Sequence, residues 1–426
     1  MTDVLLVGGG GREHALAWKL AQSPSLGRMV AAPGNPGIAA HARCVPVKDT
    51  AVDELVDLAR QERPDLVVVG PEVPLALGLA DRLRAAGFAV FGPSAAAARL
   101  ESSKAFSKDL MARHGVPTAR FRTFQDATAA RRYCRELGAP LVVKADGLAA
   151  GKGVIVCRAL DEADRALALC FEERAFGASG LTVVVEEFLE GEEASFFALA
   201  DGAAVLPLVA AQDHKTVFDE DRGPNTGGMG AYSPAPVMSD AMQDRVMAEI
   251  VRPVIAAMGK EGAPYTGVLF VGLMITREGP KVIEFNCRFG DPECQAIMPR
   301  LEGDLLALLQ AAATGQGLPA ALSWSPRSSV CVVMTSAGYP GRYETGRPIT
   351  GVAAAAGLPG VNVFHAGTAM AGNALVTAGG RVLGVQALGG DVASAIRAAY
   401  AGVERIRFDG AHYRRDIGHH ALRRIG

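Results

Sequence analysis

The sequence has no surplus of positive charge. Its 426 residues include 43 Lys and Arg against 45 Asp and Glu, which gives a formal net charge of −2 at pH 7. Non-specific binding to nucleic acid relies on a broad basic surface, so we expect no nucleic-acid partner. Hydrophobic residues make up 49% and charged residues 21%, as in ordinary globular proteins. A chain of this length predicts roughly three domains.

Long apolar runs are also missing. The longest stretch without Asp, Glu, Lys or Arg is 348–380, and several glycines, Pro359 and Asn362 interrupt it, so we expect no membrane-spanning helix. No Lys or Arg precedes the first apolar run, and the glycine cluster 8–11 cuts that run short. We therefore expect no signal peptide and no membrane partner.

The seven cysteines form no metal-type pair. Cys287 and Cys294 are the closest two in the chain, and their spacing matches no common zinc motif. Scattered thiols of this kind are typical of a reducing compartment, so we expect a cytoplasmic protein.

A complete dinucleotide-binding fingerprint is missing as well. The fingerprint G-x-G-x-x-G can start at Gly8 or Gly9, but Glu13 and His14 then stand where the third glycine belongs. No acidic residue follows the second strand, which ends near Ala32. A nicotinamide cofactor is therefore not expected. A phosphate-binding loop and a simple tight turn both remain open for the glycine cluster.

Short apolar runs and helical patterns alternate through the first hundred residues. This rhythm predicts an open parallel α/β sheet, with ligands at the ends of its strands. A domain boundary near Leu100 would give an N-terminal domain of residues 1–100. The expected strands are 4–7, 65–69 and 88–91, and the expected helices are 51–61 and 75–86.

A glycine-rich segment, 145–153, resembles a P-loop but departs from its pattern. Three residues instead of four separate Gly147 from Gly151, Gly153 replaces the hydroxyl residue, and the strand-like run 154–157 follows. The pattern predicts a hairpin flap whose N–H groups close over phosphates, and a merely flexible hairpin is the alternative. The lysines that would add charge are Lys144 and Lys152.

Two further segments favour ligand binding. The strand 182–185 runs into the acidic linker 186–193, which suits a nucleotide-binding hinge, although a solvated acidic turn explains it equally well. The polar segment from Gln212 to Pro236 is predicted to be a long loop, either a shaped binding loop or a disordered one. Its candidates for holding a small polar substrate are Asp213, Asn225 and Thr226.

The segment 281–295 carries the most distinctive set of polar residues. Glu284 and Asn286 are two apart on a predicted strand, so they share a face, and their oxygens suit Mg²⁺. Arg288 could grip a carboxylate or phosphate with two hydrogen bonds. An ordinary polar strand face is the alternative. The strand pairs in a predicted hairpin with 267–275.

The remaining organisation is predicted in outline. A central domain spans 101–316 and contains a flap subdomain of about 118–190. A helix is expected over 238–258. A C-terminal domain, 326–426, is expected to be a small α+β unit without a clustered acid–base or metal set, and to act as a cap that completes the wall of the active site.

These segments resemble the ATP-grasp superfamily, and most closely its glycinamide ribonucleotide synthetase family. The resemblance covers most of the first three quarters of the chain in order and is weaker beyond. The matching stretches are GGGGREHALAWK from Gly8, APGNPG from Ala32, GPEVPL from Gly70, ESSKAFSKD from Glu101, KADGLAAGKGV from Lys144, EEFLEGEEASF from Glu186, GPNTGGMGAYSP from Gly223 and EFNCRFGDPECQ from Glu284.

The resemblance implies an ATP site between two α+β subdomains of a central ATP-grasp fold with a mobile flap. It implies Mg²⁺ or Mn²⁺ on Glu284 and Asn286. Many ATP-grasp enzymes add a carboxylate from the preceding strand, but 268–275 contains no acid. The implied ATP contacts are Lys104, Lys144, Gly147, Gly151, Lys152 and Gly153 at the phosphates, Glu186, Phe188 and Leu189 at adenine, and Glu193 at the ribose.

The resemblance also implies an activity, the ligation of glycine to 5-phosphoribosylamine in purine biosynthesis. Glycine would form glycyl phosphate with ATP, and the amine would then displace phosphate to give glycinamide ribonucleotide, with ADP and phosphate released. Arg288 would stabilise the acyl phosphate, and Asp213 and Asn225 would hold glycine. The other implied substrate contacts are Gly10, Gly11, Asn35, Thr226, Asp291 and Glu293.

Two alternatives stay open at this stage. One is another ATP-grasp enzyme of purine synthesis or carboxylation, and the other is a nucleotide-binding regulator without turnover. We expect a stand-alone enzyme that acts as a monomer, with a dimer as the alternative, and whose partners are small molecules only.

Overall fold

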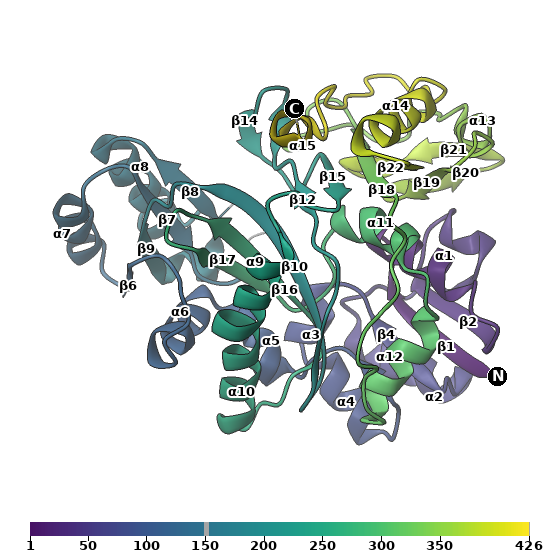
Figure 1. Cartoon of the computed structure of the whole chain (residues 1–426), viewed down its shortest axis with the longest axis horizontal. Helices are drawn as coiled ribbons and strands as arrows, with labels where there is room; N and C mark the ends of the chain where they lie inside the picture. Colours follow the sequence, from purple (N-terminus) through teal and green to yellow (C-terminus); the bar gives the residue numbers. More distant parts are fainter. Residues whose placement is uncertain (149–152, 426) are drawn as a thin grey trace.

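The computed structural model describes residues 1–148 and 153–425 (Figure 1). It confirms the predicted order of a parallel α/β sheet, a central α+β region and a C-terminal α+β unit. No helix in these described ranges combines the length and the hydrophobicity needed to cross a bilayer.

The N-terminal sheet has five parallel strands in the order β3-β2-β1-β4-β5. All four residues of β4 are buried, as expected of a parallel strand covered on both faces. The helix predicted over 75–86 is instead two helices, because Gly78 adopts a left-handed backbone (φ 82°) between them. The elements are β1 (Thr2–Gly8), α1 (Gly11–Leu20), β2 (Leu26–Pro33), β3 (Arg43–Cys44), α2 (Val52–Glu62), β4 (Leu66–Val69), α3 (Glu72–Ala76), α4 (Leu79–Ala85) and β5 (Val90–Phe91).

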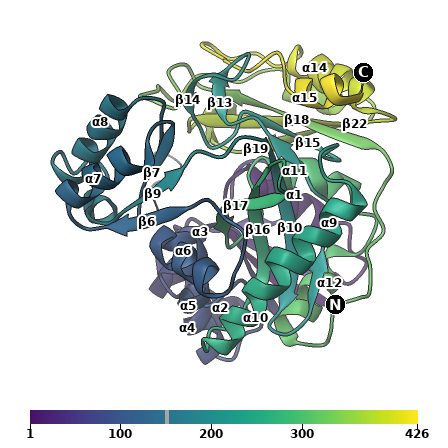
Figure 2. The same cartoon turned by 60° about the vertical axis from the view of Figure 1, so that its left-hand side comes forward.

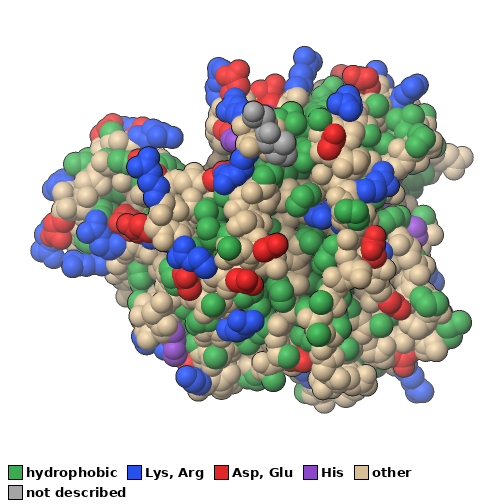
Figure 3. Space-filling view, viewed as in Figure 1, with side chains coloured by type: hydrophobic (Ala, Val, Ile, Leu, Met, Phe, Trp, Pro, Cys, Tyr) green, Lys and Arg blue, Asp and Glu red, His purple; other side chains and the backbone are tan. Residues whose placement is uncertain are grey.

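Two helices, α5 (Ala95–Ser102) and α6 (Lys104–Arg113), lead into a small lobe with its own core. Its sheet has the order β6-β9-β7-β8, with α7 and α8 packed against it. Figure 3 shows this lobe standing out from the body, with acidic and basic side chains interspersed on the visible face. The elements are β6 (Phe121–Phe124), α7 (Ala127–Leu137), β7 (Leu141–Ala145), β8 (Val154–Cys157), α8 (Leu160–Phe171) and β9 (Val183–Glu187).

A second central sheet, in the order β11-β10-β16-β17, belongs to the main body. The hairpin predicted from 267 to 286 is confirmed, because β16 and β17 pair antiparallel. The helix predicted over 238–258 contains a π-helical turn at 247–251, just before Pro253, which has no amide hydrogen to donate. The elements are β10 (Glu192–Asp201), β11 (Val205–Pro207), α9 (Asp240–Val246), α10 (Arg252–Lys260), β16 (Thr266–Ile275), β17 (Pro280–Asn286), α11 (Glu293–Ile297) and α12 (Leu305–Thr314).

The C-terminal sheet corrects the prediction of a long loop from Gln212 to Pro236. That segment forms four short strands, two of which, β12 and β15, extend the sheet β12-β15-β18-β22-β19. Sequence patterning misses them because pairing with β18, not an alternating pattern, makes them strands. The elements are β12 (Gln212–Asp213), β13 (Thr216–Phe218), β14 (Arg222–Asn225), β15 (Gly230–Ser233), β18 (Ser328–Thr335), α13 (Val352–Ala356), β19 (Val361–His365), β20 (Thr368–Ala371), β21 (Ala374–Thr377), β22 (Arg381–Gly389), α14 (Val392–Val403) and α15 (His419–Ile425).

The C-terminal unit contributes two of three histidines to a cluster that the sequence analysis did not identify. The fold brings His214, which precedes β13, to His419 and His420 at the start of α15. The sequence could not indicate this, because about two hundred residues separate the two segments.

Candidate active site

A cleft of about 600 Å³ opens where the small lobe meets the main body. The elements that converge on it, β7, β9 and β17 among them, can be followed in Figure 2. Most of the predicted site residues line this cleft although they come from distant segments. They are Lys104, Lys144, Gly147, Gly153, Glu186, Phe188, Leu189, Glu193, Asp213, Asn225, Thr226, Glu284, Asn286, Arg288, Asp291 and Glu293.

Two buried lysines share the carboxylate of Glu186. Its Oε2 lies 2.9 Å from Lys108 Nζ and 3.1 Å from Lys144 Nζ, and Lys144 also donates to the carbonyl of Ile283 (2.9 Å). Burial lowers the pKa of Lys108 to about 8. The second oxygen, Oε1, is buried and has no hydrogen-bond partner among the described residues. Glu186 therefore offers an acceptor to a ligand at the linker.

Lys104 ties the start of α6 to the base of the predicted flap. Its Nζ donates to the carbonyl of Gly147 (2.9 Å), and Asp146 accepts from the N–H of Ala105 (3.0 Å). Burial lowers the pKa of Lys104. The ammonium group of Lys104 thus lies at the base of the flap, where its charge suits a phosphate group. Gly151 and Lys152, the other predicted flap contacts, lie outside the described residues.

Glu284 and Asn286 occupy one face of β17, as predicted. Burial opposes ionisation of Glu284, but the charges of Lys215, Lys144 and Lys104 outweigh it and lower the pKa. No other described side chain hydrogen-bonds to its carboxylate. Opposite it, β16 presents Gly272, so the neighbouring strand supplies no carboxylate at this register.

Further carboxylates face Glu284 across the cleft. Lys215, which sequence reasoning missed, lies 3.0 Å from Glu193 Oε2, and Asp213, Glu193 and Glu284 raise its pKa against burial. For Asp213 burial acts in the upward direction and raises the pKa, and the nearby charge of Glu293 adds to this effect. Lys215 follows Asp213 at a spacing of two, and this was the signal that could have found it.

Arg288 is held by two carboxylates that were not predicted. Its Nη2 donates to Glu101 Oε1 (2.7 Å) and its Nε to Glu72 Oε2 (3.1 Å). Arg12 lies 3.8 Å from the same Glu72 oxygen. Glu72 directly follows the Gly-Pro pair after β4, a strand end where ligands of such sheets sit, so its position was a usable signal.

The C-terminal unit closes one wall of the cleft, as predicted for a cap. Arg381 Nη1 donates to the carbonyls of Gly227 and Asp291, both at 2.6 Å. The hydroxyl of Tyr339 accepts from the N–H of Gly227 (3.0 Å), and Tyr343 also lines the cleft. These residues fasten the segment after β14 to the turn before α11.

Three predicted substrate contacts lie outside the lining of the cleft. Asn35 uses its whole amide group within the chain: Nδ2 donates to the carbonyls of Gly9 and His365, and Oδ1 accepts from the N–H groups of residues 37 and 38. Gly10 donates its N–H to Glu13 (2.7 Å), and Gly11 packs against the side chain of Gln295. Their predicted role at the phosphoribosyl group stays a prediction.

The fold and the site define an ATP-grasp protein. They combine two sheets in separate α+β subdomains, a lysine-lined cleft between them, an acidic linker and a Glu-x-Asn pair at a strand end. The chain belongs to the phosphoribosylglycinamide synthetase family. Profiles of that family match residues 2–101 (N domain), 102–294 (ATP-grasp domain) and 329–420 (C domain).

Named relatives match the sequence over nearly its whole length. It is 58% identical to a phosphoribosylamine–glycine ligase of Rhizobium meliloti and 52% identical to one of Pseudomonas aeruginosa, over 99% of both chains in each case. A crystal structure of phosphoribosylamine–glycine ligase from Thermotoga maritima matches with a TM-score of 0.85 at 32% identity, covering 97% of this chain and 100% of that chain.

A more distant structure shares only the fold. It is the biotin carboxylase domain of 2-oxoglutarate carboxylase from Hydrogenobacter thermophilus, in complex with MgADP, ADP and bicarbonate. The TM-score is 0.73 at 17% identity, covering 97% of this chain and 91% of that chain.

Proposed function

We propose that this chain joins glycine to 5-phosphoribosylamine at the expense of ATP, giving glycinamide ribonucleotide, ADP and phosphate. The family and its named relatives support the reaction. The observation that carries its assignment to the cleft is the convergence of Lys144, Glu284 and Arg288 on one site. We further propose that the protein is cytoplasmic, in keeping with seven free cysteines, and that it acts as a monomer.

ATP is proposed to lie between the small lobe and the main body. Its phosphates meet Lys104 and Lys144, and its adenine lies along the linker formed by Glu186, Phe188 and Leu189. The unpartnered Oε1 of Glu186 supports this placement, because the 6-amino group of adenine is a donor that would satisfy it. Glu193 at the start of β10 is the proposed ribose contact.

The residues of β17 fit a divalent metal. Glu284 and Asn286 offer hard oxygen ligands. The lowered pKa of Glu284 favours its carboxylate form, and no other described side chain hydrogen-bonds to it. Asn286 Oδ1 accepts one long bond from Arg288 Nη2 (3.3 Å), which leaves its second lone pair for a metal. Mg²⁺ takes one or two carboxylates and completes its shell with water and substrate phosphates. Mg²⁺ or Mn²⁺ bound there would neutralise charge on the phosphates of ATP.

The chain's own residues are proposed to position the reacting groups. A carboxylate oxygen of glycine bonds to the γ-phosphorus and ADP leaves. The amine of 5-phosphoribosylamine then bonds to the glycyl carbon, loses a proton, and phosphate leaves. Arg288 is the proposed donor to the acyl phosphate, and Asn225 and Thr226 are the proposed substrate contacts. Their common position in the lining of the cleft supports these roles, as does the fastening of the segment beside them by Arg381. Catalysis of this kind rests on positioning and charge.

The test is the substrate dependence of ADP release. With Mg²⁺ and ATP present, ADP should form at the full rate only when glycine and 5-phosphoribosylamine are both added, in equal amount to glycinamide ribonucleotide. Leaving out either substrate, or replacing glycine with bicarbonate, provides the control. ADP release that depends on bicarbonate, or no release with the complete mixture, would overturn the proposal.

A further inference from the structure

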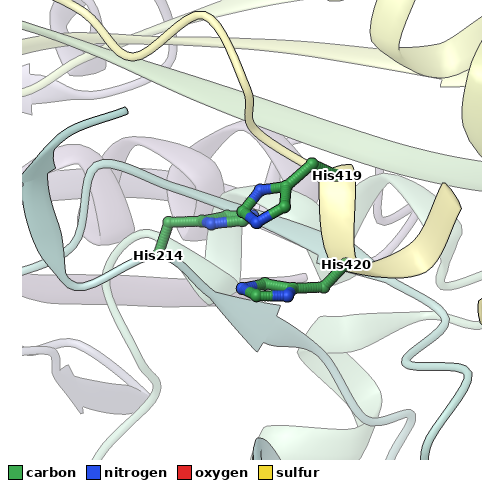
Figure 4. A group of neighbouring side chains, drawn as sticks. All are labelled: His214, His419 and His420. Atoms are coloured by element: carbon green, nitrogen blue, oxygen red, sulfur yellow. The ribbon is translucent and has the colours of Figure 1, made fainter. Parts of the chain in front are cut away.

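Three histidines gather beside the C-terminal sheet, outside the lining of the ATP cleft. His214 lies between β12 and β13, and His419 and His420 begin α15 (Figure 4). One ring nitrogen of each lies within 4.8 Å of the others. The His214 side chain has no exposed surface, whereas 39% of the His420 side chain is exposed, so the cluster reaches from the interior to solvent.

The hydrogen bonds of the rings fix which nitrogens are free. His419 Nδ1 lies 2.8 Å from the carbonyl of Asp416 and donates to it, which leaves a lone pair on Nε2. His214 Nε2 accepts from the N–H of Gly418 (2.9 Å), which places the ring proton on Nδ1. That Nδ1 is buried and has no hydrogen-bond partner among the described residues.

The free nitrogens surround the carboxylate of Asp221. Its Oδ2 lies 3.0 Å from His420 Nε2 and 3.6 Å from His419 Nε2. Its Oδ1 lies 2.9 Å from Arg414 and 3.8 Å from His214 Nδ1. Ligands at Zn–N and Zn–O distances of about 2.1 Å in a tetrahedral shell are about 3.4 Å apart, which falls between the two Oδ2 distances.

The charges leave room for a cation. Arg414 pairs with both Asp221 and Asp416, so one negative charge is left when the rings are neutral. Neutral imidazole is the form that binds metals.

We propose that His419, His420 and Asp221 bind a divalent transition metal, with Zn²⁺ the best fit. His214, whose Nδ1 lies 3.8 Å from Asp221 Oδ1, supports the negative charge of that carboxylate. Imidazole and carboxylate together suit Zn²⁺ over Mg²⁺. The Nδ1 bond of His419 to a backbone carbonyl is the kind of outer contact that fixes a ligating ring. His420 binds through Nε2 with its proton on Nδ1.

The metal would link the C-terminal helix to the active-site wall. His214 sits between Asp213 and Lys215, both of which line the ATP cleft. A metal on Asp221 and α15 therefore holds this segment through residues that do not line the cleft, without touching the reacting groups. Bound Zn²⁺ should raise the thermal midpoint of unfolding, because it binds the folded chain.

The test measures Zn²⁺ binding to the full chain without a polyhistidine tag, by calorimetry in excess Mg²⁺ and without ATP or glycine. Wild type should bind one Zn²⁺ that His420→Gln binds at least roughly tenfold more weakly, by the usual cost of losing a metal-site partner. Asp221→Asn provides a second variant, and His114→Gln at the end of α6 is the matched control. X-ray absorption should show two imidazole ligands.

Three results would overturn the inference. They are equal Zn²⁺ affinity and stoichiometry in wild type and both site variants, no Zn²⁺ binding to wild type, or a spectrum without imidazole. Because neither substrate is present, each result stands apart from any failure of the proposed ligase reaction. Circular dichroism of each variant separates a lost ligand from a lost fold.

Discussion

Arg288 donates to Glu101 through Nη2 at 2.7 Å, and this bond links the Glu-x-Asn strand to the end of α5. The other oxygen of Glu101 accepts from the backbone N–H of Cys287 (2.7 Å). Burial opposes the charge of Arg288, but Glu101 and Glu72 outweigh it and raise its pKa. Arg288 is therefore a fixed, permanently charged group in the cleft.

The first prediction concerns Glu101 as a positioning residue. Glu101→Gln keeps the shape but removes the charge and one acceptor, so Arg288 loses its strongest partner. The turnover number for ADP release should fall roughly tenfold to a hundredfold, the range expected from a misplaced catalytic group. The KM for ATP should change little, because Glu101 makes no bond to the lysines of the ATP site.

Arg288→Lys provides the second arm of that test. A lysine has a single ammonium group and cannot reach Glu101 and Glu72 with the geometry of a guanidinium fork. Its turnover should fall at least as far as that of Glu101→Gln, with the melting temperature measured alongside. Full turnover in both variants would contradict the positioning role.

The second prediction concerns Glu284 as a metal ligand. Glu284→Ala should remove most turnover while the fold persists, because the side chain lines the cleft and is not part of the core. Glu278→Ala, in the turn of the same hairpin, is the matched control, since its side chain is 77% exposed and its ion-pair partner among the described residues is Lys281. Turnover at saturating Mg²⁺ is the measurement, and an unchanged rate in Glu284→Ala would refute the assignment.

The third prediction concerns Arg381, through which the C-terminal unit holds the substrate segment. Arg381→Met removes the bonds to the carbonyls of Gly227 and Asp291, so that segment loses its fastening. The KM for glycine or 5-phosphoribosylamine should rise several-fold to tenfold. The variant loses the two charge-assisted hydrogen bonds that hold the segment, and each is worth about 1 kcal/mol or more. Initial-rate kinetics with each substrate varied provide the measurement.

Arg347→Met is the control for that variant. Arg347 also belongs to the C-terminal unit, but it is partly exposed and pairs with Glu344 and Asp409 away from the cleft. Equal KM values in the two variants would show that Arg381 acts only through the stability of the unit.

What the sequence could predict depended on whether the signal was local. The parallel strand 65–69 and the hairpin ending at Asn286 follow from patterning and turn residues, and Glu284 with Asn286 follows from strand alternation. The role of Arg381 could not be predicted, because it depends on β22 packing beside a segment about 150 residues earlier. Asn35 was predicted as a substrate contact from the family resemblance, whereas the bonds of its side-chain oxygen to the N–H groups of residues 37 and 38 could be seen only in the folded turn.

The last prediction concerns two buried histidines where α1 meets β19 of the C-terminal sheet. His14 Nδ1 accepts from the backbone N–H of His365 (2.7 Å). Burial lowers the pKa of His14 to about 3 and that of His365 to about 4. The unfolded chain takes up protons near pH 6.5 that the folded chain refuses, so this stability is present above pH 6.5 and is lost as the pH falls.

His14→Asn tests this, because the Asn oxygen replaces Nδ1 as acceptor and does not titrate. Between pH 7.5 and 5.5 the free energy of unfolding of wild type should fall by roughly 1 kcal/mol more than that of the variant, from a single histidine with an unfolded pKa near 6.5. Urea denaturation in a metal chelator, at both pH values, provides the measurement. The test compares how much the free energy of unfolding changes between the two pH values. A loss of stability in the variant that is the same at both pH values therefore does not affect the result. An equal fall in the free energy of unfolding of both proteins would contradict the prediction. It would mean that His14 becomes protonated in the folded chain at mildly acidic pH.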